Sequence, residues 1–217
     1  MKWFVAMSGN IGSGKSTLTT LLCQRLGWQP YYEVVDENPY LPDFYSDMSR
    51  WSFHLQIFFL TRRFRHHQEI LRAPHSVIQY RTIYEDVEIF ARNLYMQGLM
   101  SERDFRAYHD LFHMMTAFLR PPDLIVYLRA PTDVLLRRIQ TRARDFERRI
   151  PSEYLGQLNE RYEEWIAHFT LCPVMTLDAA TIDLNDVDTL VTGMQQRLPS
   201  LFPLRGSPWA PPQERRP

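Results

Sequence analysis

The sequence predicts an α/β protein with a five-stranded parallel sheet that is flanked by helices on both faces. Short apolar segments of strand length alternate along the chain with longer segments in which apolar residues recur at helical spacing. A glycine-rich turn follows the first apolar segment and precedes the first helical one. Strands that alternate with helices in this way form parallel sheets covered on both faces, and the ligand binds at the carboxyl ends of the strands.

The expected strands are short apolar runs of the kind that is buried in a parallel sheet. We place them at residues 2–7, 31–35, 76–79, 124–128 and 174–177.

The expected helices occupy the longer segments between and after these strands. They are placed at residues 16–26, 50–71, 83–98, 101–120, 132–141, 152–169 and 185–198. The first stops at Gly27 and the third at Gly98, because glycine commonly ends a helix. The fourth opens on a capping box from Ser101 to Asp104 and ends before Pro121. The second and the last are amphipathic, which indicates one buried face in each.

Length and composition predict one domain. At 217 residues with 45% hydrophobic residues, the chain can bury one complete α/β core and is short for two. We assign residues 1–205 to this domain. Residues 206–217 are rich in proline and end in basic residues, so we expect a disordered tail there.

The charge balance excludes several classes of partner. Twenty-five Lys and Arg residues balance twenty-five Asp and Glu residues, so no net field attracts nucleic acid or an anionic membrane surface. No eighteen apolar residues run together, so no membrane span is expected. Cys23 and Cys172 lack metal-ligand spacing and are expected to be reduced, buried thiols, which favours a cytoplasmic protein.

The glycine-rich turn matches the complete P-loop pattern G-x-x-x-x-G-K-[ST]. The matching residues are Gly9-Asn10-Ile11-Gly12-Ser13-Gly14-Lys15-Ser16, followed by Thr17. In a P-loop the backbone N–H groups surround phosphates, the lysine contacts the β and γ oxygens, and the Ser or Thr hydroxyl binds Mg²⁺. An ordinary Gly/Ser turn is disfavoured because an apolar strand precedes the motif and a leucine-rich helix follows it. The motif predicts ATP with Mg²⁺ as ligand and leaves the phosphate acceptor open.

Further segments resemble the deoxynucleoside kinase family over about residues 1–177. They include Glu33-Val34-Val35-Asp36-Glu37-Asn38-Pro39, Phe44-Tyr45, Arg50 to Gln56, Arg62-Arg63-Phe64, Arg81-Thr82-Ile83-Tyr84-Glu85-Asp86 and Arg142-Ala143-Arg144. The resemblance is nearest to the bacterial deoxyadenosine/deoxyguanosine kinase branch. It implies a P-loop kinase fold with an arginine-rich lid at about residues 142–150.

The resemblance implies catalytic roles for two residues beside the P-loop lysine. Glu33 matches the carboxylate that accepts the proton of the 5′-hydroxyl, a role that suits an acid at the carboxyl end of a strand. The alternative is an exposed surface Glu. Arg81 is similar to the arginine beside the acceptor oxygen and the γ-phosphate.

The resemblance also implies a deoxynucleoside pocket. Gln56 is similar to the glutamine that contacts the base, Asp86 to the acid at its other edge, and Arg63 to the arginine that holds this acid. The residues expected to bind the 3′-hydroxyl are Tyr45 and Glu147, and those expected to form the wall of the base pocket are Trp51, Phe53 and Phe90. Each aromatic residue taken alone is as well explained as part of the core.

Three arginines, Arg138, Arg142 and Arg144, match the lid arginines that close over the donor phosphates. Several guanidinium groups together with Mg²⁺ can stabilise the charge that develops during phosphoryl transfer. The alternative is a solvated, charged end of a helix.

The chain departs from the family pattern at Tyr80, where an Asp or Glu normally precedes the arginine and helps to hold Mg²⁺. A phenol titrates near pH 10 and supplies no anionic oxygen at neutral pH. Three accounts remain open: a weakened enzyme, a variant that uses Asp36 or Glu37 instead, or a regulatory relative with poor catalysis. We favour the first, because the other phosphate-binding positions match. Val34, where many relatives have proline, is a mild change.

The sequence therefore predicts a kinase that phosphorylates a purine deoxynucleoside, deoxyadenosine first and deoxyguanosine next, with deoxycytidine as a further candidate. A nucleoside monophosphate kinase such as thymidylate kinase and a nucleotide-binding module without turnover are the alternatives. A homodimer through the helices at residues 51–71 and 84–98 is expected from the resemblance.

Overall fold

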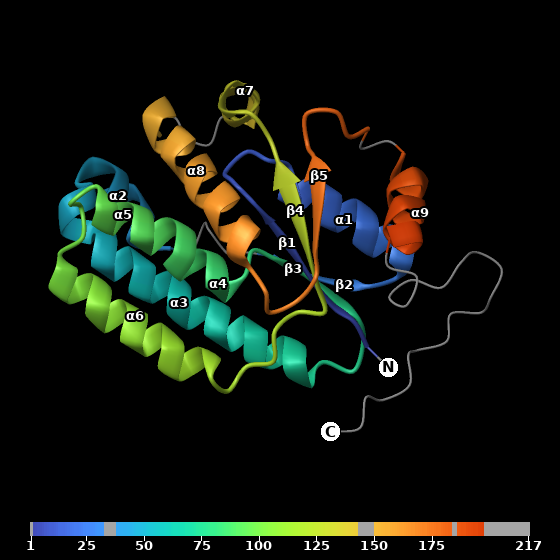
Figure 1. Cartoon of the computed structure of the whole chain (residues 1–217), viewed down its shortest axis with the longest axis horizontal. Helices are drawn as coiled ribbons and strands as arrows, with labels where there is room; N and C mark the ends of the chain where they lie inside the picture. Colours follow the sequence, from blue (N-terminus) through green and yellow to red (C-terminus); the bar gives the residue numbers. More distant parts are fainter. Residues whose placement is uncertain (1, 33–37, 143–149, 184–185, 198–217) are drawn as a thin grey trace.

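A computed structural model of the chain describes residues 2–32, 38–142, 150–183 and 186–197 (Figure 1). Its centre is a five-stranded parallel sheet in the order β2-β3-β1-β4-β5. The strands are β1 (Phe4–Gly9), β2 (Gln29–Tyr31), β3 (Val77–Tyr80), β4 (Leu124–Arg129) and β5 (Val174–Asp178). The predicted fold class is confirmed.

Strand β1 lies in the middle of the sheet, and its register positions the carboxyl edge. Met7 lies opposite Tyr80 of β3, and Gly9 lies opposite Leu128 of β4. The backbone N–H of Arg81 donates to the Met7 carbonyl at 2.9 Å, which extends the pairing past the end of β3. The segments that follow β1 and β3 therefore begin next to each other.

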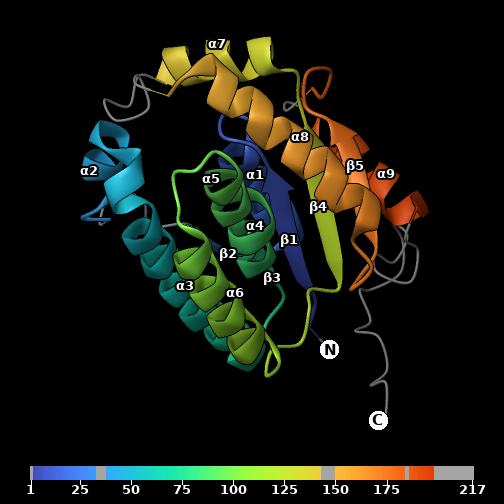
Figure 2. The same ribbon diagram turned by 60° about the vertical axis from the view of Figure 1, so that its left-hand side comes forward.

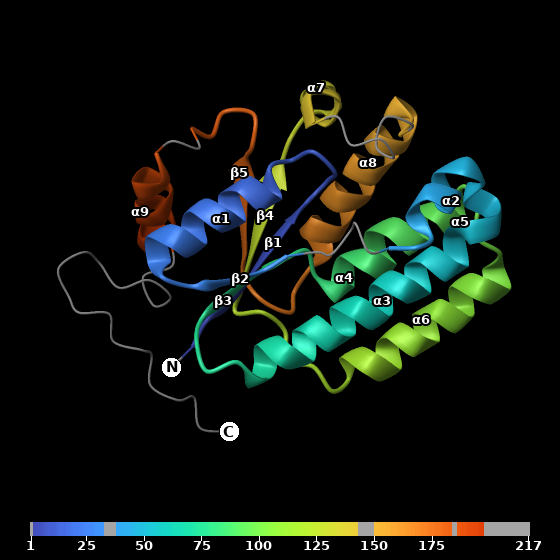
Figure 3. The same cartoon turned by 180° about the vertical axis from the view of Figure 1, so that it is seen from behind.

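Helices cover both faces of the sheet (Figures 1 and 2). They are α1 (Lys15–Leu26), α2 (Leu41–Ser46), α3 (Met48–Arg72), α4 (Ile83–Glu85), the π-helix η1 (Asp86–Ala91), α5 (Arg92–Met96), α6 (Glu102–Thr116), α7 (Thr132–Arg142), α8 (Ser152–His168) and α9 (Val187–Arg197). Helices α1 and α9 lie on one face, and α3 to α6 and α8 lie on the other, as the view from behind also shows (Figure 3). Helix α7 lies beside the carboxyl ends of the strands.

Alternate residues of β1 face two separate hydrophobic cores. Phe4 and Ala6 belong to the larger core, under α3 to α6 and α8, whereas Val5 and Met7 belong to the core under α1 and α9. This alternation follows from the two-residue period of a strand. Both faces of β1 are buried, and its residues from Phe4 to Met7 are all apolar, as expected for an inner strand of a parallel sheet.

The structure corrects several details of the predicted elements: β1 extends to Gly9 where residue 7 was expected as the end, and α6 ends at Thr116 where residue 120 was expected. Strand β2 covers Gln29–Tyr31, earlier than the expected 31–35, of which 33–35 lie outside the described residues. The short helix α2 was not expected; it begins with Leu41 and Pro42, and proline is compatible with a first helical turn. The helix expected at 83–98 contains the π-helix η1, and five of the six η1 residues are buried. The helix expected there is therefore present, and the correction is its π-helical turn.

In the described parts of the chain, none of the helices combines the length and the apolar character that crossing a membrane requires.

Both cysteines are free, as expected, with Cys23 buried and Cys172 half-buried. Burial raises the pKa of each thiol to about 12. At pH 8 the thiolate fraction of each is then about 10⁻⁴, and the thiolate is the reactive form. We therefore expect both thiols to react with a maleimide very slowly in the folded protein and rapidly in urea. Mass spectrometry of the labelled protein would check this, and rapid labelling without urea would contradict it.

Candidate active site

The P-loop joins β1 to α1 through glycines in conformations that other residues rarely adopt. Gly9 has φ 140°, and an added Cβ would lie 2.6 Å from the Leu128 carbonyl oxygen. Gly12 has φ 82°, and its Cβ would lie 2.9 Å from the Leu135 carbonyl oxygen. Glycine is therefore required at both positions by backbone angle and by space. The loop leads directly into the amino terminus of α1, where backbone N–H groups and the helix dipole favour an anion.

Lys15 lies across the inside of this loop and is 2% exposed. Its Nζ donates to the carbonyl oxygens of Gly9 and Asn10, both at 2.7 Å, and approaches Ser13 Oγ at 3.4 Å. The ammonium also lies 5.0 Å from the centroid of the Tyr80 ring. The residue expected to contact phosphate is thus fixed at the centre of the P-loop, with Tyr80 beside it.

Helix α7 brings arginines to the same place. Arg138 donates to the Ser13 carbonyl at 3.2 Å and to the Ala179 carbonyl at 2.7 Å, and so connects α7 to the P-loop. A pocket of about 470 Å³ opens between them, and its lining is Gly12, Gly14, Lys15, Ser16, Thr17, Tyr80, Arg137, Arg138, Thr141 and Arg142. Arg138 and Arg142 therefore both line the pocket beside the P-loop. Arg137 and Thr141 were missed, although both lie on the predicted helix.

Two P-loop side chains point away from this pocket. Asn10 donates through Nδ2 to the Leu155 carbonyl at 2.9 Å and to Asn159 Oδ1 at 2.7 Å, which connects the P-loop to α8. Ile11 packs against the larger core. Only the backbone of these two residues can bind phosphate.

Arg81 follows β3 and has φ 64°, the only positive φ of a non-glycine residue among the described residues. Its guanidinium lies 4.4 Å from the centroid of the Phe90 ring, and its Nε lies 3.9 Å from Glu85 Oε2. A left-handed arginine costs about 1 kcal/mol or more and persists where surrounding contacts hold it, often at a functional site.

A buried ion pair forms the second part of the site, on the side of α3. Arg63 Nε donates to both carboxylate oxygens of Asp86 at 2.6 Å, and both side chains are almost completely buried. Gln56 lies two turns before Arg63 on the same face of α3 and is 2% exposed. Its Oε1 is buried and has no hydrogen-bond partner among the described residues. An acceptor buried in this way calls for a donor.

The π-helix η1 positions two of the expected residues. Asp86 is its first residue and Phe90 its fifth, and both are buried. A π-helical turn is wide, so both side chains can face inward between α3 and α8, and such turns are frequent at functional sites. The widened turn therefore carries both Asp86, which pairs with Arg63, and Phe90, whose ring lies under the Arg81 guanidinium.

The remaining predicted residues divide into two groups. Tyr45 and Phe53 are half-buried and pack against the larger core. Trp51 lies roughly 140° around α3 from Gln56, and its ring contacts Tyr40 at 5.8 Å and His54 at 5.4 Å. Residues Glu33, Arg144 and Glu147 lie outside the described residues.

The Arg63–Asp86 pair gives a prediction for stability. Replacing Arg63 with Ala should lower the free energy of unfolding by about 3–5 kcal/mol, because Asp86 would stay buried without this partner. Arg65→Ala, at an exposed position of the same helix, should change it by less than about 0.5 kcal/mol. Urea denaturation of both variants would check this, and equal losses would contradict it.

Comparison with known proteins agrees with this geometry. The family described as deoxynucleoside kinase matches residues 5–196. The deoxyadenosine/deoxycytidine kinase of Bacillus subtilis (strain 168) is 39% identical over 200 residues, which cover 91% of this chain and 92% of that protein. The deoxyadenosine kinase of Dictyostelium discoideum is 41% identical over 162 residues, or 75% of this chain and 66% of that protein.

Solved structures of deoxyadenosine kinase from M. mycoides are similar as well. The structure with bound dATP superposes with a TM-score of 0.81 at 28% identity and covers 89% of this chain and 99% of its own. The structure with dCMP and a flexible dCDP bound has a TM-score of 0.79 at 30% identity and covers 90% and 99%. The match over residues 5–196 and the identity across nearly the whole of a relative show that the chain belongs to the deoxynucleoside kinase family.

Proposed function

We propose that the chain transfers the γ-phosphate of ATP to the 5′-hydroxyl of a purine deoxynucleoside. The observation that carries the proposal is the arrangement of two sites around Arg81. Tyr80, the residue before Arg81, lines the P-loop pocket, and Phe90, over which the Arg81 guanidinium lies, shares η1 with Asp86, the partner of Arg63. Arg81 directly follows β3, the strand that pairs with β1 and so ends next to the P-loop, and its guanidinium lies over the Phe90 ring of η1. It thus connects a phosphate site to a base site.

The proposed reaction uses the positive groups around the P-loop. The 5′-oxygen attacks the γ-phosphorus, the bond to the oxygen that bridges the β- and γ-phosphates breaks, and Glu33 accepts the hydroxyl proton. Lys15 and Arg138 lie where they can bind the donor phosphates, and we assign the same role to Arg142 and Arg144. Arg81 stabilises the negative charge on the equatorial oxygens during transfer.

The base is read by one amide and one carboxylate. A glutamine amide offers both a donor and an acceptor, which matches the N6 and N7 edge of adenine, whereas the same edge of guanine offers two acceptors. Arg63 fixes the Asp86 carboxylate as a second acceptor. We therefore place deoxyadenosine first, deoxyguanosine next and deoxycytidine as a further candidate. The relatives include kinases named for deoxyadenosine, deoxyguanosine and deoxycytidine.

The sugar and the base ring are assigned to the remaining predicted residues. Tyr45 and Glu147 are proposed to hydrogen-bond the 3′-hydroxyl. Phe53 and Phe90 are proposed as the wall of the base pocket. Trp51 is retained in this wall as a proposal supported by the resemblance alone, because its ring contacts are with Tyr40 and His54.

Mg²⁺ is the expected cofactor, since it neutralises charge on the transferring phosphate. The Ser16 hydroxyl lines the pocket and is a suitable ligand. Among the described residues that line the pocket, however, there is no Asp or Glu, and Tyr80 is the phenol beside Lys15. The donor set fits Mg²⁺ only in part. We propose that metal binding and turnover are weakened, and that Asp36 or Glu37 is the alternative source of a carboxylate.

We also place the protein in the cytoplasm, a proposal supported by its two free thiols.

A coupled phosphoryl-transfer assay with ATP, Mg²⁺ and each of the four deoxynucleosides tests the proposed function. Deoxyadenosine should be the best acceptor. Tyr80→Asp should raise kcat roughly tenfold or more, equivalent to about 1.4 kcal/mol, and should lower the Mg²⁺ concentration required. Tyr80→Phe is the matched control, because it keeps the ring and supplies no carboxylate, and it should leave the Mg²⁺ requirement unchanged.

The alternatives give other outcomes in the same experiment. Faster transfer to a deoxynucleoside monophosphate would favour a thymidylate-kinase-like enzyme, and a monophosphate would then raise the melting temperature more than the nucleoside does. ATP binding with no turnover by any form would favour the binding module. Equal Mg²⁺ dependence of the Tyr80→Asp protein and the unchanged chain would rule out Tyr80 as the weak point.

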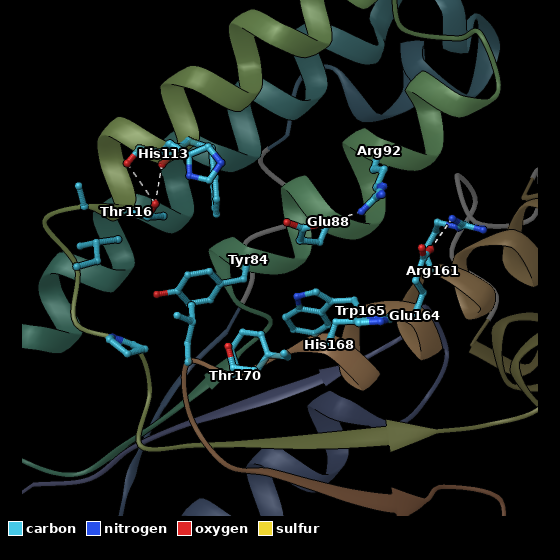
Figure 4. A pocket seen from close by; sticks show the side chains of 16 residues that line it. Tyr84, Glu88, Arg92, His113, Thr116, Arg161, Glu164, Trp165, His168 and Thr170 are labelled. Carbon is cyan, nitrogen blue, oxygen red and sulfur yellow. Dashed lines mark hydrogen bonds and ion pairs between the residues drawn. The ribbon is translucent and has the colours of Figure 1, made fainter.

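We further propose a homodimer. Most large hydrophobic side chains that are exposed in the described chain lie on α5, α6 and the segments that follow α6 and α8: Tyr95, Met96, Met114, Phe118 and Leu171. Leu171 lines a pocket of about 760 Å³, in which aromatic residues such as Tyr84 and Trp165 adjoin the ion pairs Glu88–Arg92 and Arg161–Glu164 (Figure 4). This surface carries both signs of charge, so a second copy can complement it. Of the two helices expected to form the dimer, the one at 84–98 contributes Tyr95 and Met96 to these exposed side chains, and the contribution of α3 (51–71) is proposed from the resemblance alone.

Light scattering tests the dimer. The chain of 25.9 kDa should scatter as a particle of about twice that mass. Phe118→Asp should shift the protein to a monomer, because a charge would replace a side chain that is 83% exposed in one protomer. Tyr32→Asp, at an exposed aromatic residue beside α1, is the control and should stay dimeric. A monomeric unchanged chain would remove the proposal.

A further inference from the structure

Glu85 is a completely buried carboxylate at the junction of four elements, and neither the motifs nor the proposed reaction assigns it a role. It is the last residue of α4, directly before Asp86, and four residues after Arg81. We infer that Glu85, held by Tyr162, is a positioning residue that fixes the Arg81 guanidinium beside the reacting phosphoryl group. This inference rests on the proposed function, since it gives Arg81 its partner.

The two carboxylate oxygens of Glu85 have different partners. Oε1 accepts from the Thr82 backbone N–H at 2.8 Å and from the Thr82 hydroxyl at 3.3 Å, which completes a capping box at the start of α4. Oε2 accepts from the Tyr162 hydroxyl at 2.8 Å, lies 3.5 Å from the Gly9 N–H and 3.9 Å from Arg81 Nε. The capping box accounts for the hydrogen bonds of Oε1 but not for the contacts of Oε2. The contacts of Oε2 connect the first P-loop residue, the arginine and α8.

Arg81 needs such support because two of its features are unfavourable without it. Its backbone adopts φ 64°, and its cationic side chain is 8% exposed. The Glu85 carboxylate compensates the charge near Nε, and the Phe90 ring supports the guanidinium face at 4.4 Å. The capping box fixes Thr82, the residue next to Arg81, and so restrains the strained backbone. One side chain thereby restrains both the backbone and the head group of the arginine.

Tyr162 holds Glu85 from the opposite side. Its ring is completely buried, stacks on Tyr127 at 5.8 Å and meets the edge of Phe90 at 6.5 Å. Burial raises the pKa of the Tyr162 hydroxyl well above its usual range, and the Glu85 carboxylate raises it further, so the hydroxyl remains a donor. Helix α8, which carries Tyr162, is also hydrogen-bonded to the P-loop through Asn10. Helix α8 is thus connected to Arg81 through the hydrogen bond from Tyr162 to Glu85 and the ion pair of Glu85 with Arg81.

Two conservative variants separate positioning from folding. Glu85→Gln keeps the shape and an oxygen acceptor but removes the charge, and Tyr162→Phe removes only the hydroxyl. Two controls match them: Glu69→Gln, at an exposed position of α3, and Tyr127→Phe, whose hydroxyl donates to Glu163 at 2.9 Å instead. Melting temperature and circular dichroism report whether each variant folds.

The first readout is kinetic. A misplaced catalytic group can cost about 10²-fold in rate, so Glu85→Gln should lower kcat by about that factor and Tyr162→Phe by about tenfold. The KM for ATP should change less than about threefold, because Lys15 and Arg138 still bind the donor phosphates. Both controls should retain kcat. Unchanged kcat in folded Glu85→Gln and Tyr162→Phe would overturn the inference.

The second readout does not require turnover. The ¹⁵N relaxation of the Arg81 Nε–H group, assigned by its loss in Arg81→Lys, should show an ordered side chain in the unchanged protein. Glu85→Gln should make it mobile, and Tyr162→Phe should increase its mobility. If the chain fails to phosphorylate any deoxynucleoside, the proposed function is wrong, and this measurement still decides whether Glu85 fixes Arg81. A rigid Arg81 in both variants would overturn the inference; if Glu85→Gln does not fold, Tyr162→Phe alone decides.

Discussion

The parallel pairing of β1 with β3 determines the geometry of the site. The hydrogen bond from the Arg81 N–H to the Met7 carbonyl continues the ladder past β3, so the chain leaves β3 next to the strand end from which the P-loop starts. Parallel strands all end at one edge of a sheet, and the P-loop glycines and the strained arginine therefore meet there. The positions of the P-loop glycines and of Arg81 thus depend on the pairing of the two strands and not only on the loop that contains each of them. A shift of this register by one residue would turn the side chains of β3 to opposite faces and separate the two.

The helical layer beside this edge contains several buried charges, and each has a specific partner. Asp86 binds Arg63, Glu85 faces Arg81, and Lys15 Nζ binds two backbone carbonyls. Burying charged groups is unfavourable unless they are paired and hydrogen-bonded, so this part of the protein sacrifices stability for fixed geometry. The apolar cores around β1 and β4 make that possible, because they stabilise the fold independently of the charged groups. The residues proposed to act in the reaction therefore lie where the burial of charge costs the most stability.

Much of the fold and part of the site follow from the sequence. The P-loop pattern and the alternation of apolar segments depend on neighbouring residues, which is why β1, α1 and the five-stranded sheet are correctly predicted. A helix was expected over residues 83–98, but its π-helical turn η1 was not, because the spacing of apolar residues does not separate a π-helical turn from an α-helical one. Glu85 and Tyr162 are 77 residues apart, and their hydrogen bond depends on how α8 packs on η1. No local pattern can indicate such a contact. The ring contacts of Trp51 likewise depend on where α2 and the residues before it lie on α3.

Tyr80 lines the phosphate pocket and lies apart from the residues proposed to bind the acceptor. Its ring attracts the Lys15 ammonium, an interaction of roughly 0.5–2 kcal/mol in such settings, whereas a carboxylate at this place would bind both the lysine and a hydrated metal ion. Lys15 must therefore exchange its contacts with the ring and the carbonyls for phosphate oxygens when ATP binds. Gln56, Arg63 and Asp86 belong to α3 and η1, and none of them lines the phosphate pocket. The proposed base site and the phosphate pocket thus lie on separate elements, so we expect a change at Tyr80 to alter the rate of transfer without altering which deoxynucleoside is bound.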